Sequence, residues 1–379
     1  MTVNHPSKPI SEIYGSRLNN SIEPLPNYFS ESNYMPYNHL RNLEELDQNA
    51  LILNGYDYTH NDPYGEAEAY FQFCQTNLSE HQQNWNVQPA RFFIRDVASI
   101  NALAALRHNY YVIGVNKGTV IRTHFFFDSI RQVLKQADFS AYAELEAHLP
   151  DDIARLMYQT CLQWVYYHEL AHLIQYSQLD NAPCAEQAQQ ELEMEESYSD
   201  NPTNDPYDQE KHLKEFDADL HGGYFIVLQL IGYWKQLSEN RRNTANLTLL
   251  LSAGASAIFS YFILMMQRYP DIYYLASDHP HPLVRVLYII DQFLKVTAKE
   301  LSPEIAPEAT TILTKTFQLS ESLYLHYSGV NYVKAFADIF KNEKENIEQY
   351  VNDVLIPNSK QMPCLVLERM RAQKNQVEF

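Results

Sequence analysis

The stretch YYHELAHLIQYS, residues 166–177, decides how the rest of the sequence is interpreted. It places His168 and His172 four positions apart, with Glu169 directly after the first histidine. On an α-helix, positions four apart lie on the same face, one turn apart, so the two imidazoles can reach one metal ion. Glu169 then projects beside that metal, where its carboxylate can take a proton from a zinc-bound water.

The surrounding residues favour a metal site over an ordinary buried helix. The segment CLQWVYYHELAHLIQY, residues 161–176, is apolar enough to form a core helix. Two histidines and a glutamate on such a helix would lose several kcal/mol of hydration energy if they had neither a partner nor a metal. Because a motif this short also arises by chance, a third ligand is required.

A glutamate on a second helix is the predicted third ligand. A metzincin would have glycine at position 175 and histidine at position 178, whereas this chain has Gln175 and Gln178, which excludes that class. The segment EFDADLHGG instead supplies Glu215 and Asp219 on one helix face. We expect Glu215 to bind the metal and Asp219 to accept a hydrogen bond from a ligating histidine, which fixes the tautomer of that histidine.

Two other interpretations of this acidic helix stay open at the level of sequence. Asp217 is an alternative ligand, and Glu215, Asp217 and Asp219 could also form a solvated face. The apolar run YFIVLQLIGYW follows shortly after them and argues against a fully exposed helix.

A segment with two His-Pro pairs, SDHPHPLVRVLYIID, residues 277–291, supplies a further candidate. Proline suits the first turn of a helix, so each histidine lies close to a helix N-terminus. A histidine placed there near zinc can donate a hydrogen bond to the oxyanion of a tetrahedral intermediate. His279 is the predicted residue and His281 the alternative, and a helix-capping role competes for either one.

In this order, HELAH, EFDAD and DHPHPLVR resemble the HExxH, ExxxD and His-Pro-plus-Arg succession of the gluzincin zinc metallopeptidases that include HtpX and the CAAX prenyl endopeptidases. The segment YYVIGVNKGTVIRTHFFFDSIRQVL is similar to the one that precedes the active-site helix there. The resemblance spans roughly residues 95–295 and extends more weakly to the Lit-type phage-exclusion peptidases. The chain departs from the membrane members, which have several clear spanning helices, and its terminal segments do not resemble the family.

The resemblance implies a fold and a site. The fold would be α+β and mostly helical, a zincin-like catalytic domain with a small sheet beside the active-site helix. An edge strand of that sheet would hold an extended protein or peptide substrate by backbone pairing. Carried over by position, the zinc ligands are His168, His172 and Glu215, with Glu169 as general base and His279 near the oxyanion.

The pattern along the chain predicts three parts. Residues 1–89 form an N-terminal wrapping segment, residues 90–300 the metallopeptidase domain, and residues 301–379 a helical C-terminal segment. Inside the domain, residues 180–212 form an acidic, proline-broken loop. Before the motif helix, predicted over residues 151–179, the expected order is strand (ARFFIRD), helix (VASINALAALR), two strands in NYYVIGVNKGTVIRTHFFF, and helix (FDSIRQVLKQA).

Charge and cysteine content restrict the location and the partners. The formal net charge of −19 argues against nucleic acid as a partner, and the four cysteines form no CxxC pair, as expected of a reduced cytoplasmic protein. Residues 245–266 are uncharged and about long enough to span a bilayer. A single crossing would place His279 on the opposite side from Glu169, so burial in the core is the expectation and membrane association the alternative.

The predicted function is therefore that of a zinc-dependent endopeptidase, with Zn²⁺ as cofactor and Glu169 as general base. The alternative is a catalytically silent or regulatory zinc-binding protein of the same fold.

Overall fold

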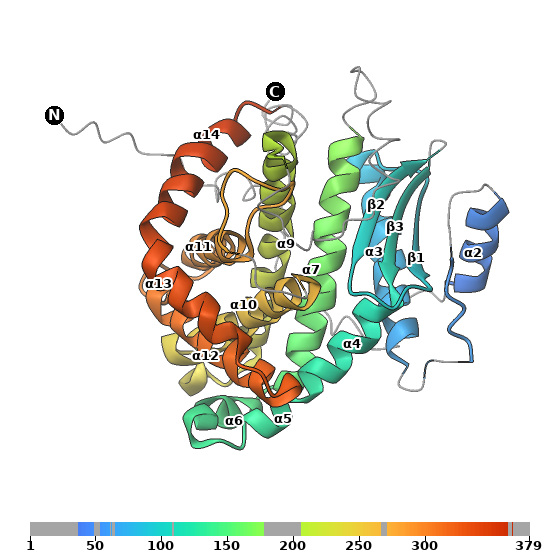
Figure 1. The fold of residues 1–379 in the computed structure, drawn as a ribbon. Helices are drawn as coiled ribbons and strands as arrows, with labels where there is room; N and C mark the ends of the chain where they lie inside the picture. Colours follow the sequence, from blue (N-terminus) through green and yellow to red (C-terminus); the bar gives the residue numbers. More distant parts are fainter. Residues whose placement is uncertain are drawn as a thin grey trace, which may run out of the picture.

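The computed structural model describes residues 37–48, 54–60, 62, 65–107, 110–177, 206–266, 271–362 and 366. Within these residues the chain is mostly helical and carries one three-stranded sheet, which confirms the α+β, mostly helical class (Figure 1). The helices are α2 (His39–Gln48), α3 (Glu66–Trp85), α4 (Lys117–Asp128), α5 (Ile130–Val133), η1 (Ala137–Phe139), α6 (Ser140–Glu146), α7 (Ile153–Tyr176), α9 (Gln209–Gln236), η4 (Glu239–Arg241), α10 (Thr244–Met266), α11 (Pro282–Glu300), α12 (Ala309–Ser328), α13 (Tyr332–Tyr350), η5 (Val351–Leu355) and α14 (Ile356–Ser359).

The sheet contains β1 (Ala90–Arg95), β2 (Ala102–Arg107) and β3 (Tyr110–Asn116) in the order β1-β3-β2. Strand β3 is parallel to β1 and antiparallel to β2. Successive side chains of a strand point to opposite faces. Phe92 accordingly packs into the main core with α3, whereas Phe93 packs on the other face against Leu46 of α2.

Two predicted elements before the motif helix are wrong. The segment VASINALAALR contains strand β2 instead of a helix, because its Ala- and Leu-rich residues pair along the whole of β3. The second strand predicted in NYYVIGVNKGTVIRTHFFF is helix α4, and only the first is a strand. The buried residues of α4 include Val120, Thr123 and Phe127, which recur at the three- and four-residue spacing of a helix.

The first turn of α4 holds the chain between β1 and β2. Gly118 donates its backbone N–H to Val97 O at 3.0 Å, and Thr119 bonds to both backbone polar atoms of Asn101 at 2.8 Å. A Cβ atom at Gly118 would lie 2.1 Å from the backbone oxygen of Ala98. Glycine at this position therefore allows the close approach that fixes Asn101.

We expect Gly118→Ala to lower the free energy of unfolding by about 1–3 kcal/mol, because the methyl group meets backbone atoms that cannot move aside. Denaturant unfolding measures the change. Gly232→Ala in α9 is the matched control, since nothing lies within 4 Å of its added Cβ. This control should be neutral or slightly stabilising, and an equal loss in both variants would contradict the packing argument.

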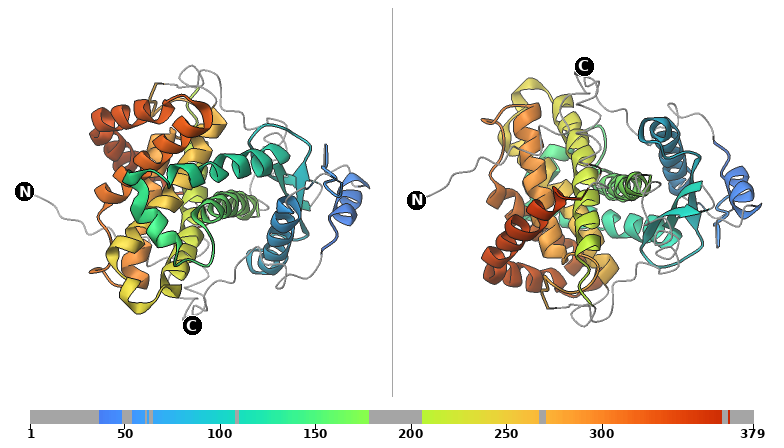
Figure 2. Two further views of the ribbon diagram at one scale, coloured as in Figure 1. Left: turned by 90° about the horizontal axis from the view of Figure 1, so that it is seen from below. Right: turned by 90° about the horizontal axis from the view of Figure 1, so that it is seen from above.

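Helix α7 runs through the middle of the protein, between the sheet and the helices that follow it in sequence (Figure 2). Asp152 caps its N-terminus by accepting a hydrogen bond from Arg155 N at 2.8 Å. Helix α9 lies alongside α7 and is capped in the same way by Asp208, which accepts from Lys211 N at 3.1 Å. The predicted helix over residues 151–179 is confirmed as α7, whose bounds are slightly shorter.

Helix α10 is the one described helix that is long and apolar enough to cross a membrane, with a mean hydropathy of 1.9 over its most apolar window. In the structure, 89% of that window is buried. Ser256, in the middle of α10, lies 2.6 Å from Ser320 of α12, so small side chains bring these two helices together. Core helices and membrane spans share this length and composition, so the location of the protein stays a prediction.

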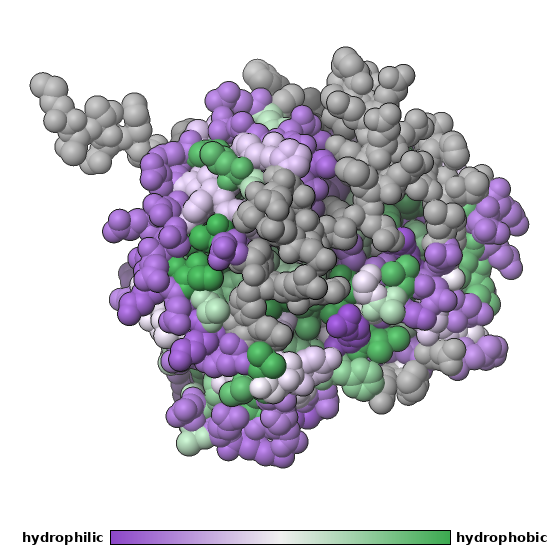
Figure 3. Space-filling model, in the orientation of Figure 1, coloured by the Kyte–Doolittle hydropathy of each residue, from purple (hydrophilic) through white to green (hydrophobic). Residues whose placement is uncertain are grey.

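Apolar side chains are scattered over the described surface on the face that Figure 3 shows. On the face shown in Figure 3, hydrophilic side chains cover much of the described surface, and the hydrophobic ones form small separate groups. Scattered apolar groups of this size are normal for a protein surface.

One hydrophobic core joins residues from all three predicted parts of the chain. It includes Tyr70 of α3, Leu162 of α7 and Phe317 of α12. The hydroxyl of Tyr70 donates to the backbone oxygen of Leu162 at 2.9 Å, so α3 is packed against the motif helix. Of the predicted acidic loop, residues 180–205 lie outside the described residues, and Gln209–His212 belong to α9.

Candidate metal centre

The candidate site lies between α7 and α9, which face each other along most of their length. His168 and His172 lie one turn apart on α7, and Glu215 faces them from α9. The helices come close at Gly222, where a Cβ atom would lie 3.0 Å from the indole nitrogen of Trp164. The three predicted ligands therefore meet at one point in the core, as their spacing in the sequence indicated.

The three side chains form a group that could hold a metal ion. The Nε2 atoms of His168 and His172 are 3.1 Å apart; that of His168 lies 3.3 Å from Oε2 of Glu215, and that of His172 lies 3.1 Å from Oε1. Zinc bonds to nitrogen and oxygen ligands are about 2.0–2.2 Å long, so donors around tetrahedral zinc lie about 3.3–3.6 Å apart. The observed donor separations fall within a few tenths of an ångström of that spacing.

Asp219 lies beside the first histidine. Its Oδ1 atom lies 3.0 Å from Nδ1 of His168. A proton on Nδ1 would be attracted to this carboxylate and would leave the lone pair of the neutral ring on Nε2, the nitrogen that faces Glu215.

Gln175 holds the second histidine, a role that we did not predict. Its Oε1 atom accepts from Nδ1 of His172 at 3.0 Å. From the sequence, Gln175 was informative only because a metzincin would have glycine at this position. Its position three residues after His172, on the same helix face, is the signal that could have found it.

Arg285 of α11 joins the two acidic residues of α9. Its Nε and one terminal nitrogen lie 2.8 and 2.7 Å from the two carboxylate oxygens of Asp219, and the same terminal nitrogen lies 3.2 Å from Glu215. The guanidinium also stacks over the ring of Phe262 at 4.3 Å, and Tyr288 donates its hydroxyl to Asp219. The motif DHPHPLVR contained Arg285, and the structure gives it this contact.

The electrostatics of the site favour a cation among the ligands. Burial alone would lower the pKa of His168, but the charge of Glu215 and the contact with Asp219 outweigh it and raise this pKa to about 10. Burial would raise the pKa of Glu215, but the histidines around it hold that pKa well below its usual range. Protons and a metal ion therefore compete for the same nitrogen atoms.

Of the remaining candidate residues, His279 reaches the site, whereas His281 and Asp217 have other contacts. Nε2 of His279 lies 3.8 Å from Glu215, and Nδ1 lies 2.6 Å from Asp278. His281 instead caps α11 by accepting from Leu283 N at 3.2 Å, and burial lowers its pKa to about 3. Asp217 lies outside the group of three candidate ligands, and its carboxylate accepts from Gln175.

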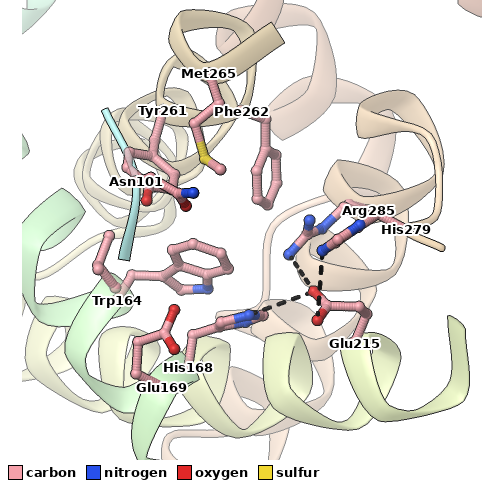
Figure 4. Close-up of a pocket in the computed structure, with 11 residues that line it drawn as sticks. Asn101, Trp164, His168, Glu169, Glu215, Tyr261, Phe262, Met265, His279 and Arg285 are labelled. Atoms are coloured by element: carbon pink, nitrogen blue, oxygen red, sulfur yellow. Dashed lines mark ion pairs between the residues drawn. The ribbon is translucent and has the colours of Figure 1, made fainter. Parts of the chain in front are cut away.

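Glu169 lies beside the candidate metal group, at a small pocket with a cavity volume of about 10 Å³, which is room for about one water molecule. Figure 4 shows Glu169 and His168 on one side of this pocket and His279, Arg285 and Glu215 on another. The remaining wall is largely apolar, and Asn101 lies beside it. Its residues come from α7 and α10 and are Trp164, Val165, Tyr261, Phe262 and Met265.

The fold and the site together define a mostly helical protein with a buried His-His-Glu group that could hold a metal ion. No family model matches the chain, and no curated protein or solved structure shows a significant match to it. The resemblance to the gluzincins therefore rests on the motifs alone.

Proposed function

We propose that the protein is a zinc-dependent endopeptidase with a zincin-like catalytic domain. The observation that carries the proposal is that Glu169 lines the same pocket as His168 and Glu215, so a general base stands beside the candidate metal group. Two histidines and one carboxylate, with a fourth position left open, are a known ligand set of catalytic zinc.

Each residue at the pocket has a task in this reaction. Zinc held by the three ligands would polarise the scissile carbonyl and lower the pKa of a water molecule. Glu169 takes a proton from the attacking water and passes it to the leaving amine. His279 is held through Nδ1 by Asp278 and lines the pocket, so a proton on its Nε2 could be donated to the developing oxyanion.

The sheet and α10 supply two features that suit a peptide substrate. Strand β2 is the edge strand beside α7, and Asn101, directly before it, lines the pocket. An extended peptide can pair with such an edge. The wall formed by Trp164, Phe262 and Met265 is apolar, which favours an apolar side chain next to the scissile bond. Cys74 and Cys161 are free and buried, which supports a cytoplasmic location.

A second candidate function is a catalytically silent or regulatory zinc-binding protein. Burial is the observation that favours it, since His168, Glu169 and Glu215 are each only 4% exposed. Structural zinc sites are closed, whereas catalytic ones keep a position for substrate. The pocket beside Glu169 is what favours the peptidase over this candidate.

Metal analysis of the purified protein tests the centre on which both functions depend. We expect about one zinc per chain in the wild type, since one four-coordinate site binds one ion, and we expect zinc to be lost in Glu215→Ala. Glu210→Ala is the matched control, because Glu210 lies on the same helix, is exposed and pairs with Lys214 instead. A folded wild type that has met no chelator and contains no zinc would contradict the proposal.

A further inference from the structure

We propose that Gln175 and Asp217 position His172 for metal binding, by fixing the imidazole in the tautomer whose Nε2 carries the lone pair. Gln175 contacts His172 directly, and Asp217 acts through Gln175. The inference rests on the proposed metal centre and adds two residues that the three motifs leave without a role.

The first step concerns the contact between Gln175 and His172. Oε1 of Gln175 lies 3.0 Å from Nδ1 of His172. A carbonyl oxygen can only accept, so Nδ1 carries the hydrogen and donates it. The lone pair of the neutral ring is then on Nε2, the atom that lies 3.1 Å from both His168 Nε2 and Glu215 Oε1.

The second step concerns the direction of the Gln175 amide, which α9 determines. The amide nitrogen donates to the backbone oxygen of Lys214 at 3.1 Å and to Oδ2 of Asp217 at 2.9 Å. Both partners are acceptors, so a reversed amide would place its oxygen against two other oxygens. It would also turn a donor toward His172 and so favour the tautomer with its proton on the metal-facing nitrogen.

The third step concerns burial. Gln175 and Asp217 are both fully buried, so the protein itself must hold the amide in one direction. Oδ2 of Asp217 also accepts from the backbone N–H of Val366 at 2.8 Å. A residue near the C-terminus thus fixes the carboxylate that orients Gln175, which in turn orients His172.

Zinc affinity, measured by competition with a chelator, and the visible spectrum of the Co²⁺-substituted protein test this inference. We expect Gln175→Leu to bind zinc about 10–100-fold more weakly and to change the Co²⁺ spectrum, because Nε2 of His172 is no longer held toward the metal. Asp217→Leu should have the same two effects. The double variant should lose no more zinc affinity than the single variant that binds zinc more weakly, since Asp217 acts through Gln175.

Gln292→Leu in α11 is the matched control. Gln292 is also buried, and neither of its side-chain polar atoms has a hydrogen-bond partner in the described part of the chain. This variant should keep the wild-type zinc affinity and Co²⁺ spectrum. Gln175→Met, which retains the length of the side chain but lacks the carbonyl acceptor, serves as a second variant and should behave as Gln175→Leu does.

Wild-type zinc affinity and an unchanged Co²⁺ spectrum in a folded Gln175→Leu or Gln175→Met variant would overturn the positioning role and leave the metal centre standing. A wild type that binds neither zinc nor Co²⁺ would overturn the metal centre, and this inference with it.

Discussion

We expect Glu169→Gln to abolish most peptide hydrolysis while the protein keeps its zinc. Glu169 lies at the pocket beside the metal group and is not one of its three members. Glutamine keeps the size of the side chain but cannot take a proton from water. Loss of a positioned general base lowers a rate by a factor of about 10²–10⁴. Incubation of the zinc-loaded proteins with a mixed peptide library, followed by mass spectrometry, measures the difference.

Glu210→Gln provides the control for the charge change alone. Glu210 is on α9, exposed and outside the pocket, so this variant should cleave at the wild-type rate. Cleavage at the wild-type rate by Glu169→Gln would contradict the mechanism. A zinc-loaded wild type that cleaves no peptide in the library would instead favour the silent or regulatory zinc-binding protein. The burial of Glu169 favours the same candidate.

Local periodicity made the centre of the site predictable. The four-residue spacing of His168 and His172 places both on one helix face whatever the rest of the fold is. The same spacing places Asp219 on the face of Glu215, where it contacts His168. These predictions needed only the geometry of a single helix and the assumption that the two helices meet.

Contacts between distant segments were not predictable in this way. Gln175 owes its orientation to Lys214 and Asp217, which lie 39 and 42 positions further along the chain. Strand β2 has the composition of a helix, and it is a strand because β3 pairs with it. In both cases a partner far away in the sequence, and not the residue's own preference, determines the structure.

We expect Arg285→Leu to lower the free energy of unfolding of the metal-free protein by about 3–5 kcal/mol. The guanidinium bonds both oxygens of Asp219 and contacts Glu215, and all three side chains are buried. Removal of one partner from such a group leaves buried carboxylates without compensation. Denaturant unfolding with a chelator present measures this loss apart from any effect on metal binding. Arg131→Leu is the control. Arg131 is half-exposed, and its ion pairs with Asp128 and Asp152 should each contribute no more than about 1 kcal/mol.

The pH dependence of the Arg285→Leu effect provides a second test of the same contact. Burial would raise the pKa of Asp219, but the charge of Arg285 and the contact with His168 hold this pKa below its usual value. A carboxyl group with a lowered pKa in the folded state stabilises the protein above its unfolded pKa, about 4 for aspartate, and this stabilisation is lost as the pH falls through the folded value. Because the variant lacks the stabilisation, the difference from wild type should be largest near pH 7 and should narrow on acidification. A difference that stays constant down to low pH would mean that the loss comes from packing of the Arg285 side chain against Phe262, and not from the charge pair with Asp219.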